Sequence, residues 1–332
     1  MKKPNLFSFA TGELSQDAFI SWLLDWGNPS NEAENSSLHQ LGREFLLAIL
    51  AKANVTIPES IDSIQVIQQQ DKIDVVAVVN DSVVVLIEDK TGTSDHSDQL
   101  LRYKEAAKAR YNKQEIVPVY FKIYDQCDFD RIQKLGYCCF LRGDIIKFFD
   151  MHWELARSSE IVSDYVEHVE NINQRINSFA TLPPREWISD SWCGFFSMIQ
   201  DRLGQPVEWS YVSNRSGGFM GYWWNWSEDH PCYLQLEEEK LCFKLAAKDD
   251  SQRSSGWDKW HEAARAAGDK CGLEFVRPQR KSIGKWMTVA YHPLDYRQAN
   301  DGGNLNVEAT LEVLKKAELV LVEAVKNGVS HG

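Results

Sequence analysis

Hydrophobic residues recur at helical spacing near the start of the chain, and the pattern then changes to one typical of strands. Residues 14–26 and 38–52 carry apolar side chains three or four positions apart, which predicts two helices. From Ser63 the chain becomes rich in β-branched residues and includes the runs IDVVAVV and VVVLIE. These runs predict three strands, the last two forming a hairpin around Asn80 and Asp81.

The pattern alternates between helix and strand over the next hundred residues. Strong helix formers in DQLLRYKEAAKARY predict a helix, and the apolar run IVPVYFKIY predicts a strand. A short strand over 137–141 and helices over 144–155 and 161–179 follow. This order predicts an α/β fold with an αβββαβ core, extra elements and a mixed central sheet of three or four strands.

Two prolines in TLPPREW cannot continue a helix, and they suggest a domain boundary. We therefore expect one domain over residues 1–180 and a second, α+β accessory domain over 185–328. In the second domain, PVEWSYV, GYWWNW, CYLQLE and KLCFKLA predict antiparallel strands, and residues 257–271 and 306–326 predict helices. The aromatic rings of GYWWNW could stack on bases or form the core of this domain, and alternation favours the core because it places at least half of the rings on one buried face.

Composition indicates an ordinary globular protein, with 43% hydrophobic and 25% charged residues. No apolar run approaches the ~18 to 20 residues that a membrane helix needs, and no apolar signal-peptide segment follows the first lysines. We therefore expect a cytoplasmic protein without a membrane partner. The seven cysteines show neither zinc-site spacing nor a disulfide framework.

The formal net charge of -12 argues against a surface coated in positive potential. Residues 1–150 hold 16 basic and 22 acidic side chains and the remainder holds 20 and 26, so neither half is basic. A nucleic-acid enzyme with this charge would need a local basic groove or a bound metal ion.

Charged residues interrupt the two strands of the predicted hairpin. Asp74 is the second residue of IDVVAVV, Glu88 ends VVVLIE, and Asp89 and Lys90 follow it directly. Charges in such apolar strands are costly unless they are paired or bind an ion. Because side chains alternate along a strand, Glu88 and Lys90 share one face, Asp89 takes the other, and pairing can bring Asp74 beside Glu88.

This set of residues suits hydrolysis of a phosphodiester. Asp74 and Glu88, with a backbone carbonyl near Asp89, would supply hard oxygen ligands for Mg²⁺, with Mn²⁺ able to substitute. Lys90 would orient or activate the attacking water and stabilise developing negative charge.

At these residues the sequence resembles the PD-(D/E)XK nuclease superfamily, whose members carry an acid on one strand and Glu-x-Lys on the next around a restriction-endonuclease-like αβββαβ core. Ile73 stands where many members have proline before the acid. The resemblance also implies a metal-binding acid from the first helix. Glu13 and Asp17, one turn apart, are the two options, and we favour Glu13.

The helix after Lys90 carries Gln99 and Tyr103 one turn apart, which is similar to the QxxxY motif of the RecB-like branch. The resemblance implies that these two residues lie beside the metal site, where they contact the substrate or position Lys90. It covers roughly residues 10–150.

The resemblance implies a metal-dependent nuclease that acts on DNA in restriction, defence or repair. The alternative is an inactive nuclease fold that serves as a binding module for a nucleic acid or protein, which the acidic charge favours. The oligomeric state stays open, with a homodimer among the options. The densest basic cluster, which includes Arg280 and Lys281, is our second candidate for substrate binding.

Overall fold

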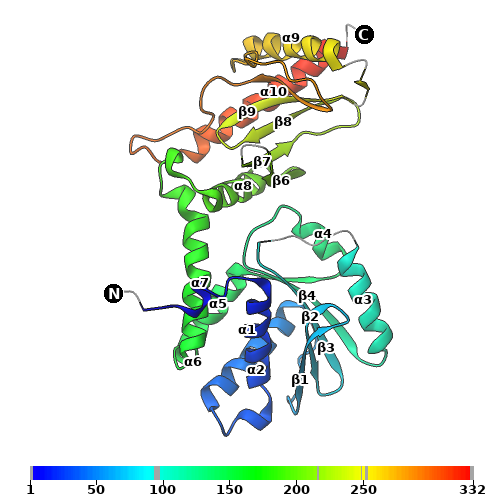
Figure 1. Cartoon of the computed structure of the whole chain (residues 1–332), viewed down its shortest axis with the longest axis vertical. Helices are drawn as coiled ribbons and strands as arrows, with labels where there is room; N and C mark the ends of the chain where they lie inside the picture. The colour runs from blue at the N-terminus through cyan, green and yellow to red at the C-terminus, as the bar shows by residue number, and fades with distance from the viewer. Residues whose placement is uncertain (1–2, 93–97, 215–216, 248, 251–252, 330–332) are drawn as a thin grey trace. The chain divides into compact units, whose positions relative to one another are not determined.

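The computed structural model describes residues 3–92, 98–214, 217–247, 249–250 and 253–329 (Figure 1). The chain forms two compact units, Met1–Gln174 and Arg175–Gly332. The division falls within helix α7 (Glu160–Asn177), ahead of the two prolines that suggested a boundary. Each unit has its own five-stranded sheet.

The sheet of the first unit is mixed, as the sequence predicts, but it has five strands rather than three or four. Its spatial order follows the chain: β1 (Ile64–Gln70), β2 (Ile73–Val79), β3 (Val83–Lys90), β4 (Glu115–Lys122) and β5 (Cys138–Leu141). Strands β1 to β3 pair antiparallel, whereas β4 and β5 run parallel to β3. This arrangement confirms the predicted restriction-endonuclease-like fold class.

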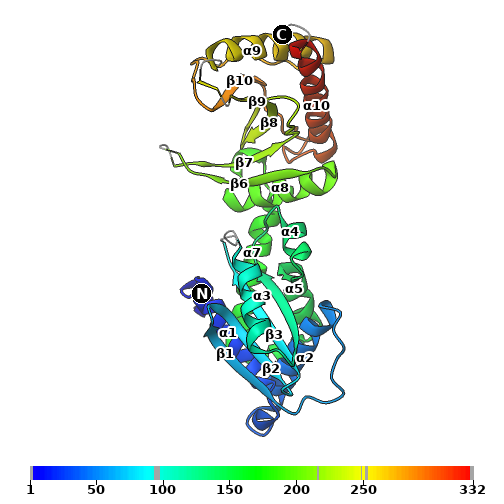
Figure 2. The same ribbon diagram turned by 90° about the vertical axis from the view of Figure 1, so that its right-hand side faces the viewer.

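Helices cover both faces of this sheet (Figures 1 and 2). They are α1 (Glu13–Trp26), α2 (Ser36–Lys52), α3 (Gln99–Arg110), α4 (Phe129–Lys134), α5 (Arg142–Met151), α6 (Trp153–Ala156) and α7. Helices α1 and α2 lie on one face, and α3 lies on the other. The single helix expected over 144–155 is two helices, and α4 was not predicted because it buries only Ile132.

Alternation along β2 and β3 assigns their side chains to these two helical layers. Val76, Val78, Val84 and Leu86 pack with Ala107 of α3. Every residue of β3 is buried, so the charged residues at its end lie in an environment with little water. Because buried charges cost folding free energy unless they are paired, the partners of these residues determine whether the strand end is stable.

The second unit contains an antiparallel sheet in the order β10-β9-β8-β7-β6. Its elements are α8 (Ser189–Leu203), β6 (Val207–Val212), β7 (Phe219–Trp224), β8 (Cys232–Glu237), β9 (Lys240–Ala246), α9 (Arg253–Cys271), β10 (Trp286–Tyr291) and α10 (Val307–Val329). Helix α8 and strand β10 were not predicted.

Short 3-10 turns occur in both units. They occupy Leu6–Ser8 and Pro29–Asn31 in the first unit, and Ser178–Ala180 and Pro184–Glu186 in the second.

The tryptophan-rich run follows the alternation that the sequence indicates. Tyr222 and Trp224 are buried in the core of the second unit, whereas half of the Trp226 side chain is exposed.

In the part of the chain that the structure describes, every helix is too short or too polar to cross a membrane.

Candidate active site

The candidate site forms where β2 and β3 meet, and antiparallel pairing aligns Val75 with Ile87. Asp74 and Glu88 are the next residues along each strand, so they lie opposite one another. Asp74, Glu88 and Lys90 also belong to the alternate positions whose side chains point toward α3. The hairpin thus brings together the three side chains that the sequence singled out.

Lys90 is the centre of a cluster of carboxylates. Its Nζ lies 2.7 Å from Glu88 Oε1 and 3.8 Å from both Asp74 Oδ2 and Glu13 Oε2. It also donates a hydrogen bond to the Asp89 carbonyl oxygen at 2.9 Å. Burial by itself lowers the pKa of Lys90, but the surrounding carboxylates outweigh burial and leave that pKa raised.

Glu88 is almost fully buried, with 1% of its surface exposed. Burial first, and then the negative charge of Asp74, raise the pKa of Glu88 to about 7, and Lys90 opposes this rise. Glu88 Oε2 is buried and has no hydrogen-bond partner. A buried carboxylate oxygen without a partner is unusual, and a bound cation would satisfy it.

The first turn of α3 supports Glu88 from above the sheet. Gln99 Nε2 donates to Glu88 Oε1 at 2.7 Å and to the Tyr103 hydroxyl at 3.2 Å. Tyr103 in turn packs against the apolar cluster beneath α3. Gln99 and Tyr103 therefore lie beside the carboxylates of the candidate site.

Asp74 is held by the backbone of the neighbouring strand. Its Oδ2 accepts a hydrogen bond from the Asp89 N–H at 2.9 Å, and its Oδ1 accepts one from Gln69 Nε2 at 3.3 Å. A charged acceptor bonded to a backbone N–H has a well-defined orientation. These two hydrogen bonds consequently fix the orientation of the Asp74 carboxylate relative to Glu88.

The two acids of α1 have different surroundings. Glu13 Oε2 lies near Lys90 Nζ, and its Oε1 accepts a weak hydrogen bond from the Thr91 N–H at 3.4 Å. Asp17 instead contacts the Asp89 side chain, and burial followed by the charge of Asp74 raises the pKa of Asp17 to about 7. Of the two, Glu13 is the one that contacts Lys90.

The Asp89 side chain points to the α1 face of the sheet. Gln16 Nε2 donates to Asp89 Oδ1 at 2.5 Å, and the Tyr165 hydroxyl donates to Gln16 Oε1 at 3.3 Å. Burial raises the pKa of Asp89 well above its ordinary value. The backbone of Asp89, through its carbonyl oxygen and its N–H, therefore faces the Lys90 cluster, whereas its side chain points away from that cluster.

We expect Asp89→Asn to retain both the fold and any DNA cleavage, because an asparagine oxygen still accepts from Gln16. Asp89→Ala leaves that buried amide unsatisfied and should lower the free energy of unfolding by about 1–3 kcal/mol. Urea unfolding and cleavage assays measure the two effects. A folded Asp89→Asn protein without cleavage would instead make the side chain part of the site.

Lys122 is a neighbour of the site that our sequence analysis missed. Parallel pairing places it beside Lys90, it is 1% exposed, and its Nζ donates to the Thr91 carbonyl oxygen at 3.2 Å. Burial lowers the pKa of Lys122 to about 8, and the charge of Lys90 adds to this effect. A lysine inside the apolar run IVPVYFKIY was the available signal.

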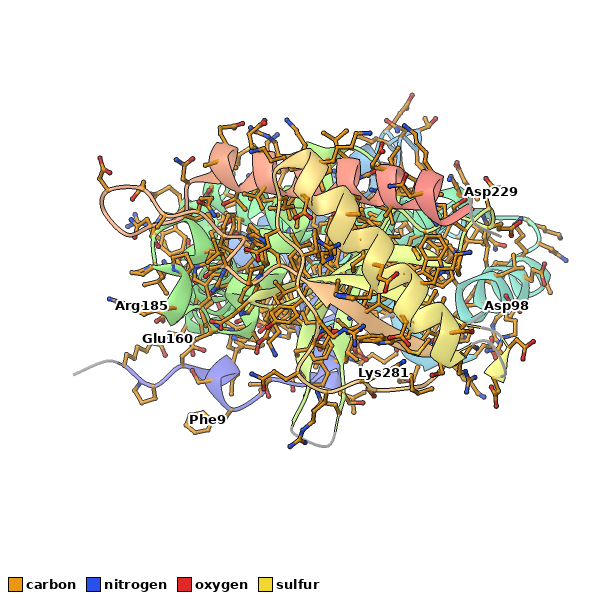
Figure 3. The ribbon with its side chains drawn as sticks, turned by 90° about the horizontal axis from the view of Figure 1, so that it is seen from above. Phe9, Asp98, Glu160, Arg185, Asp229 and Lys281 are labelled. Atoms are coloured by element: carbon orange, nitrogen blue, oxygen red, sulfur yellow. The ribbon has the colours of Figure 1, made fainter. Side chains whose placement is uncertain are left out.

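Arg280 and Lys281 belong to the second unit. Lys281 lies beside α9 (Figure 3), where its Nζ is 2.6 Å from Asp258 Oδ2 and 5.0 Å from the centre of the Trp257 ring. Arg280 is exposed. Nucleic-acid binding by these two residues remains a prediction that rests on their charge.

The oxygen atoms of the cluster fit a hard divalent cation. Asp74, Glu88 and the Asp89 carbonyl supply ligands of the required type. Glu88 Oε2 has no hydrogen-bond partner and could therefore bind a cation. Within the described ranges, no group of three or more His, Cys, Asp or Glu side chains is arranged to hold a metal. A cation would therefore depend on backbone and water oxygens in addition to carboxylates.

An acid on one strand, Glu-x-Lys on the next and an αβββαβ core together define a restriction-endonuclease-like nuclease fold. The family model of the PD-(D/E)XK nuclease superfamily matches residues 4–181, more than half of the chain. The chain belongs to this superfamily. No curated protein and no solved structure matches it significantly. Membership of the RecB-like branch remains a prediction.

Proposed function

We propose that the protein hydrolyses phosphodiester bonds in DNA with Mg²⁺, and that Mn²⁺ can replace Mg²⁺. The observation that carries this proposal is the convergence of Lys90 with Asp74 and Glu88, including a buried carboxylate oxygen that lacks a partner. Buried charges of this kind cost folding free energy, and a scaffold protein would have no need to keep them.

Asp74, Glu88 and the carbonyl of Asp89 would hold the cation, and Glu13 would assist from α1. When bound, the cation supplies positive charge at the phosphate and lowers the pKa of a water molecule. Residues of this chain would orient the reactants around it.

Lys90 would donate a hydrogen bond to the attacking water and stabilise negative charge as it develops on the phosphate. Its Nζ is fixed for this task by Glu88 Oε1 and the Asp89 carbonyl. Gln99 holds Glu88 in place, and Tyr103 holds Gln99. Gln99 and Tyr103 are also the residues we propose to contact the substrate at the edge of the site.

We favour DNA as the substrate on the strength of the superfamily resemblance, and the role we propose is restriction, defence or repair in the cytoplasm. Arg280 and Lys281 would add contacts to phosphates. The chain as a whole is acidic, so a bound cation would offset the repulsion between the site and DNA.

A panel of substrates tests this proposal. Supercoiled plasmid, linear double-stranded DNA, single-stranded DNA and RNA are incubated with the protein in Mg²⁺, in Mn²⁺ and in EDTA. We expect cleavage of DNA in either metal and none in EDTA. Cleavage of RNA alone would replace the proposed substrate but keep the site.

Metal binding should also be visible as a gain in stability, because a ligand that binds only the folded state raises the unfolding temperature. At a metal concentration of about 100 times the dissociation constant, the gain is about 2.7 kcal/mol. We expect Mn²⁺ to raise the unfolding temperature of the wild type and to have little effect on Glu88→Gln. An equal effect on both proteins would place the metal elsewhere.

A further inference from the structure

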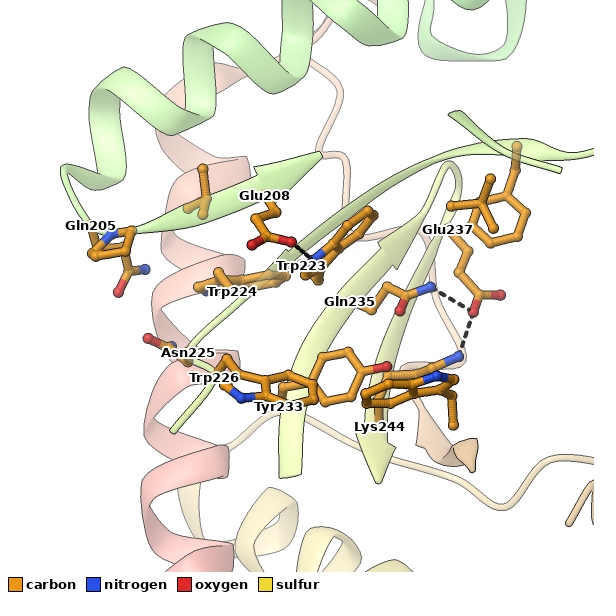
Figure 4. Close-up of a pocket in the computed structure, with 15 residues that line it drawn as sticks. Gln205, Glu208, Trp223, Trp224, Asn225, Trp226, Tyr233, Gln235, Glu237 and Lys244 are labelled. Atoms are coloured by element: carbon orange, nitrogen blue, oxygen red, sulfur yellow. Dashed lines mark hydrogen bonds and ion pairs between the residues drawn. The ribbon is translucent and has the colours of Figure 1, made fainter. Parts of the chain in front are cut away.

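The antiparallel sheet of the second unit has one face covered by helices. On that face, the Tyr222 ring lies 5.3 Å from the Phe196 ring of α8, and Trp224 Nε1 donates to Glu318 Oε1 of α10 at 2.9 Å. Trp257 of α9 is also fully buried there. Alternate residues of the same strands point to the opposite face, where they line a hollow (Figure 4).

This hollow has a cavity volume of about 940 Å³, which is within the size range of small-ligand pockets. Trp223, Trp226, Tyr233 and Trp286 provide aromatic walls. Trp226 and Trp286 remain 51% and 52% exposed. Indole rings gathered in one exposed hollow are typical of a binding surface rather than of solvated residues scattered singly.

Three of the rings support one another. The ring centres of Trp226 and Tyr233 are 4.9 Å apart, and those of Trp226 and Trp286 are 5.3 Å apart. Mutual packing fixes the orientation of each ring, so little conformational freedom is lost when a planar ligand stacks on the exposed faces. Lys285 Nζ lies 5.1 Å from the centre of the Trp286 ring and places a cation beside this group.

The charges in the hollow do not suit a phosphate. Among the described residues that line it, Lys244 is the only cation, and its Nζ lies 2.8 Å from Glu237 Oε1. Glu208 accepts a hydrogen bond from Trp223 Nε1 at 2.8 Å. Gln235 lies between these groups (Figure 4). The lining is thus aromatic and slightly acidic, which favours a neutral planar ring that carries N–H donors.

We propose that this hollow binds, within single-stranded DNA, an unpaired nucleobase with an exocyclic amino group, which adenine, cytosine and guanine carry and thymine lacks. The base would stack on Trp226, and Glu208 and Gln235 would accept its amino hydrogens. The inference rests on the proposed function in taking DNA as the ligand. The phosphates of the strand would stay outside the hollow, where Lys285 places a cation beside Trp286.

Fluorescence anisotropy of the full chain in EDTA tests this inference without cleavage. Labelled single strands of adenine, cytosine, thymine and abasic nucleotides are compared at equal length. We expect adenine and cytosine strands to bind about 10-fold or more tightly than the abasic strand, with thymine intermediate. Trp226→Ala should lose about 10-fold of this affinity, because one stacking partner is removed.

Trp153→Ala is the matched control, since Trp153 is 43% exposed in the first unit. We expect it to bind like the wild type. Equal binding of base-bearing and abasic strands, or unchanged binding by Trp226→Ala, would overturn the inference. A protein that cuts DNA in Mg²⁺ but shows no base-dependent binding refutes this inference and leaves the proposed function standing. Base-dependent binding without any cleavage would support this inference and count against the proposed function.

Discussion

Replacement of Lys90 by methionine is expected to slow DNA cleavage by about 100- to 1,000-fold, the loss that follows removal of one group that stabilises developing charge. Lys90 Nζ is the cation within 3.8 Å of Glu13, Asp74 and Glu88. Methionine keeps most of the buried aliphatic stem and removes the ammonium group. Initial rates on linear double-stranded DNA in Mg²⁺ measure the effect.

Folding must be separated from catalysis in this variant, because removing one partner of a buried ion pair typically costs about 3–5 kcal/mol. Circular dichroism and thermal unfolding are therefore recorded on the same preparation. Asp89→Asn is the matched control, since it alters the adjacent residue on the opposite face of β3. A folded Lys90→Met protein that cuts at the wild-type rate would remove Lys90 from the mechanism.

Replacement of Asp74 by asparagine is the second large effect that we expect. The asparagine oxygen still accepts the hydrogen bond from the Asp89 N–H, so the fold should be retained. One negative charge is lost from the proposed metal site. Replacing a residue that only supports a metal ligand typically lowers activity by about 10- to 100-fold. We expect the cleavage rate of Asp74→Asn to fall by more than that, because a ligand itself is altered.

This variant also separates metal binding from general electrostatics. We expect Asp74→Asn to need a higher Mn²⁺ concentration for half-maximal cleavage, whereas weakened DNA binding alone would leave the metal requirement unchanged. Titrations of Mn²⁺ at saturating DNA distinguish the two. Wild-type metal dependence in Asp74→Asn would show that its carboxylate is not a ligand.

The part of the site carried by β2 and β3 could be predicted because a charged residue lies near the start of β2 and others end β3, and the rest of each strand is apolar. Asp74, Glu88 and Lys90 stand out as costly exceptions, and alternation alone assigns them to one face. Gln99 and Tyr103 were indicated by the resemblance to the QxxxY motif, whose two named residues lie one turn apart on a helix. These are local patterns, and local patterns are what a single sequence reveals.

Other contributions depend on contacts between distant segments. Gln16 looks ordinary in sequence, and Lys122 is marked only by interrupting an apolar run. The packing of α1 and the parallel pairing of β4 place these two residues beside β3. Helix α8 was missed because its run SWCGFF mixes aromatic residues with glycine, and β10 because a basic, proline-containing loop precedes it. The aromatic hollow likewise exists only once the five strands of the second sheet align.

The most direct test of the central claim is cleavage of supercoiled plasmid by the wild type, Lys90→Met and Asp89→Asn, each in Mg²⁺, in Mn²⁺ and in EDTA. A metal-dependent nuclease built on Asp74, Glu88 and Lys90 predicts metal-dependent cutting by the wild type and Asp89→Asn, with at least about a 100-fold loss in Lys90→Met. No cutting by the wild type in either metal, or equal cutting by all three proteins, would contradict it. Absence of cutting would favour a nuclease fold that serves as a binding module.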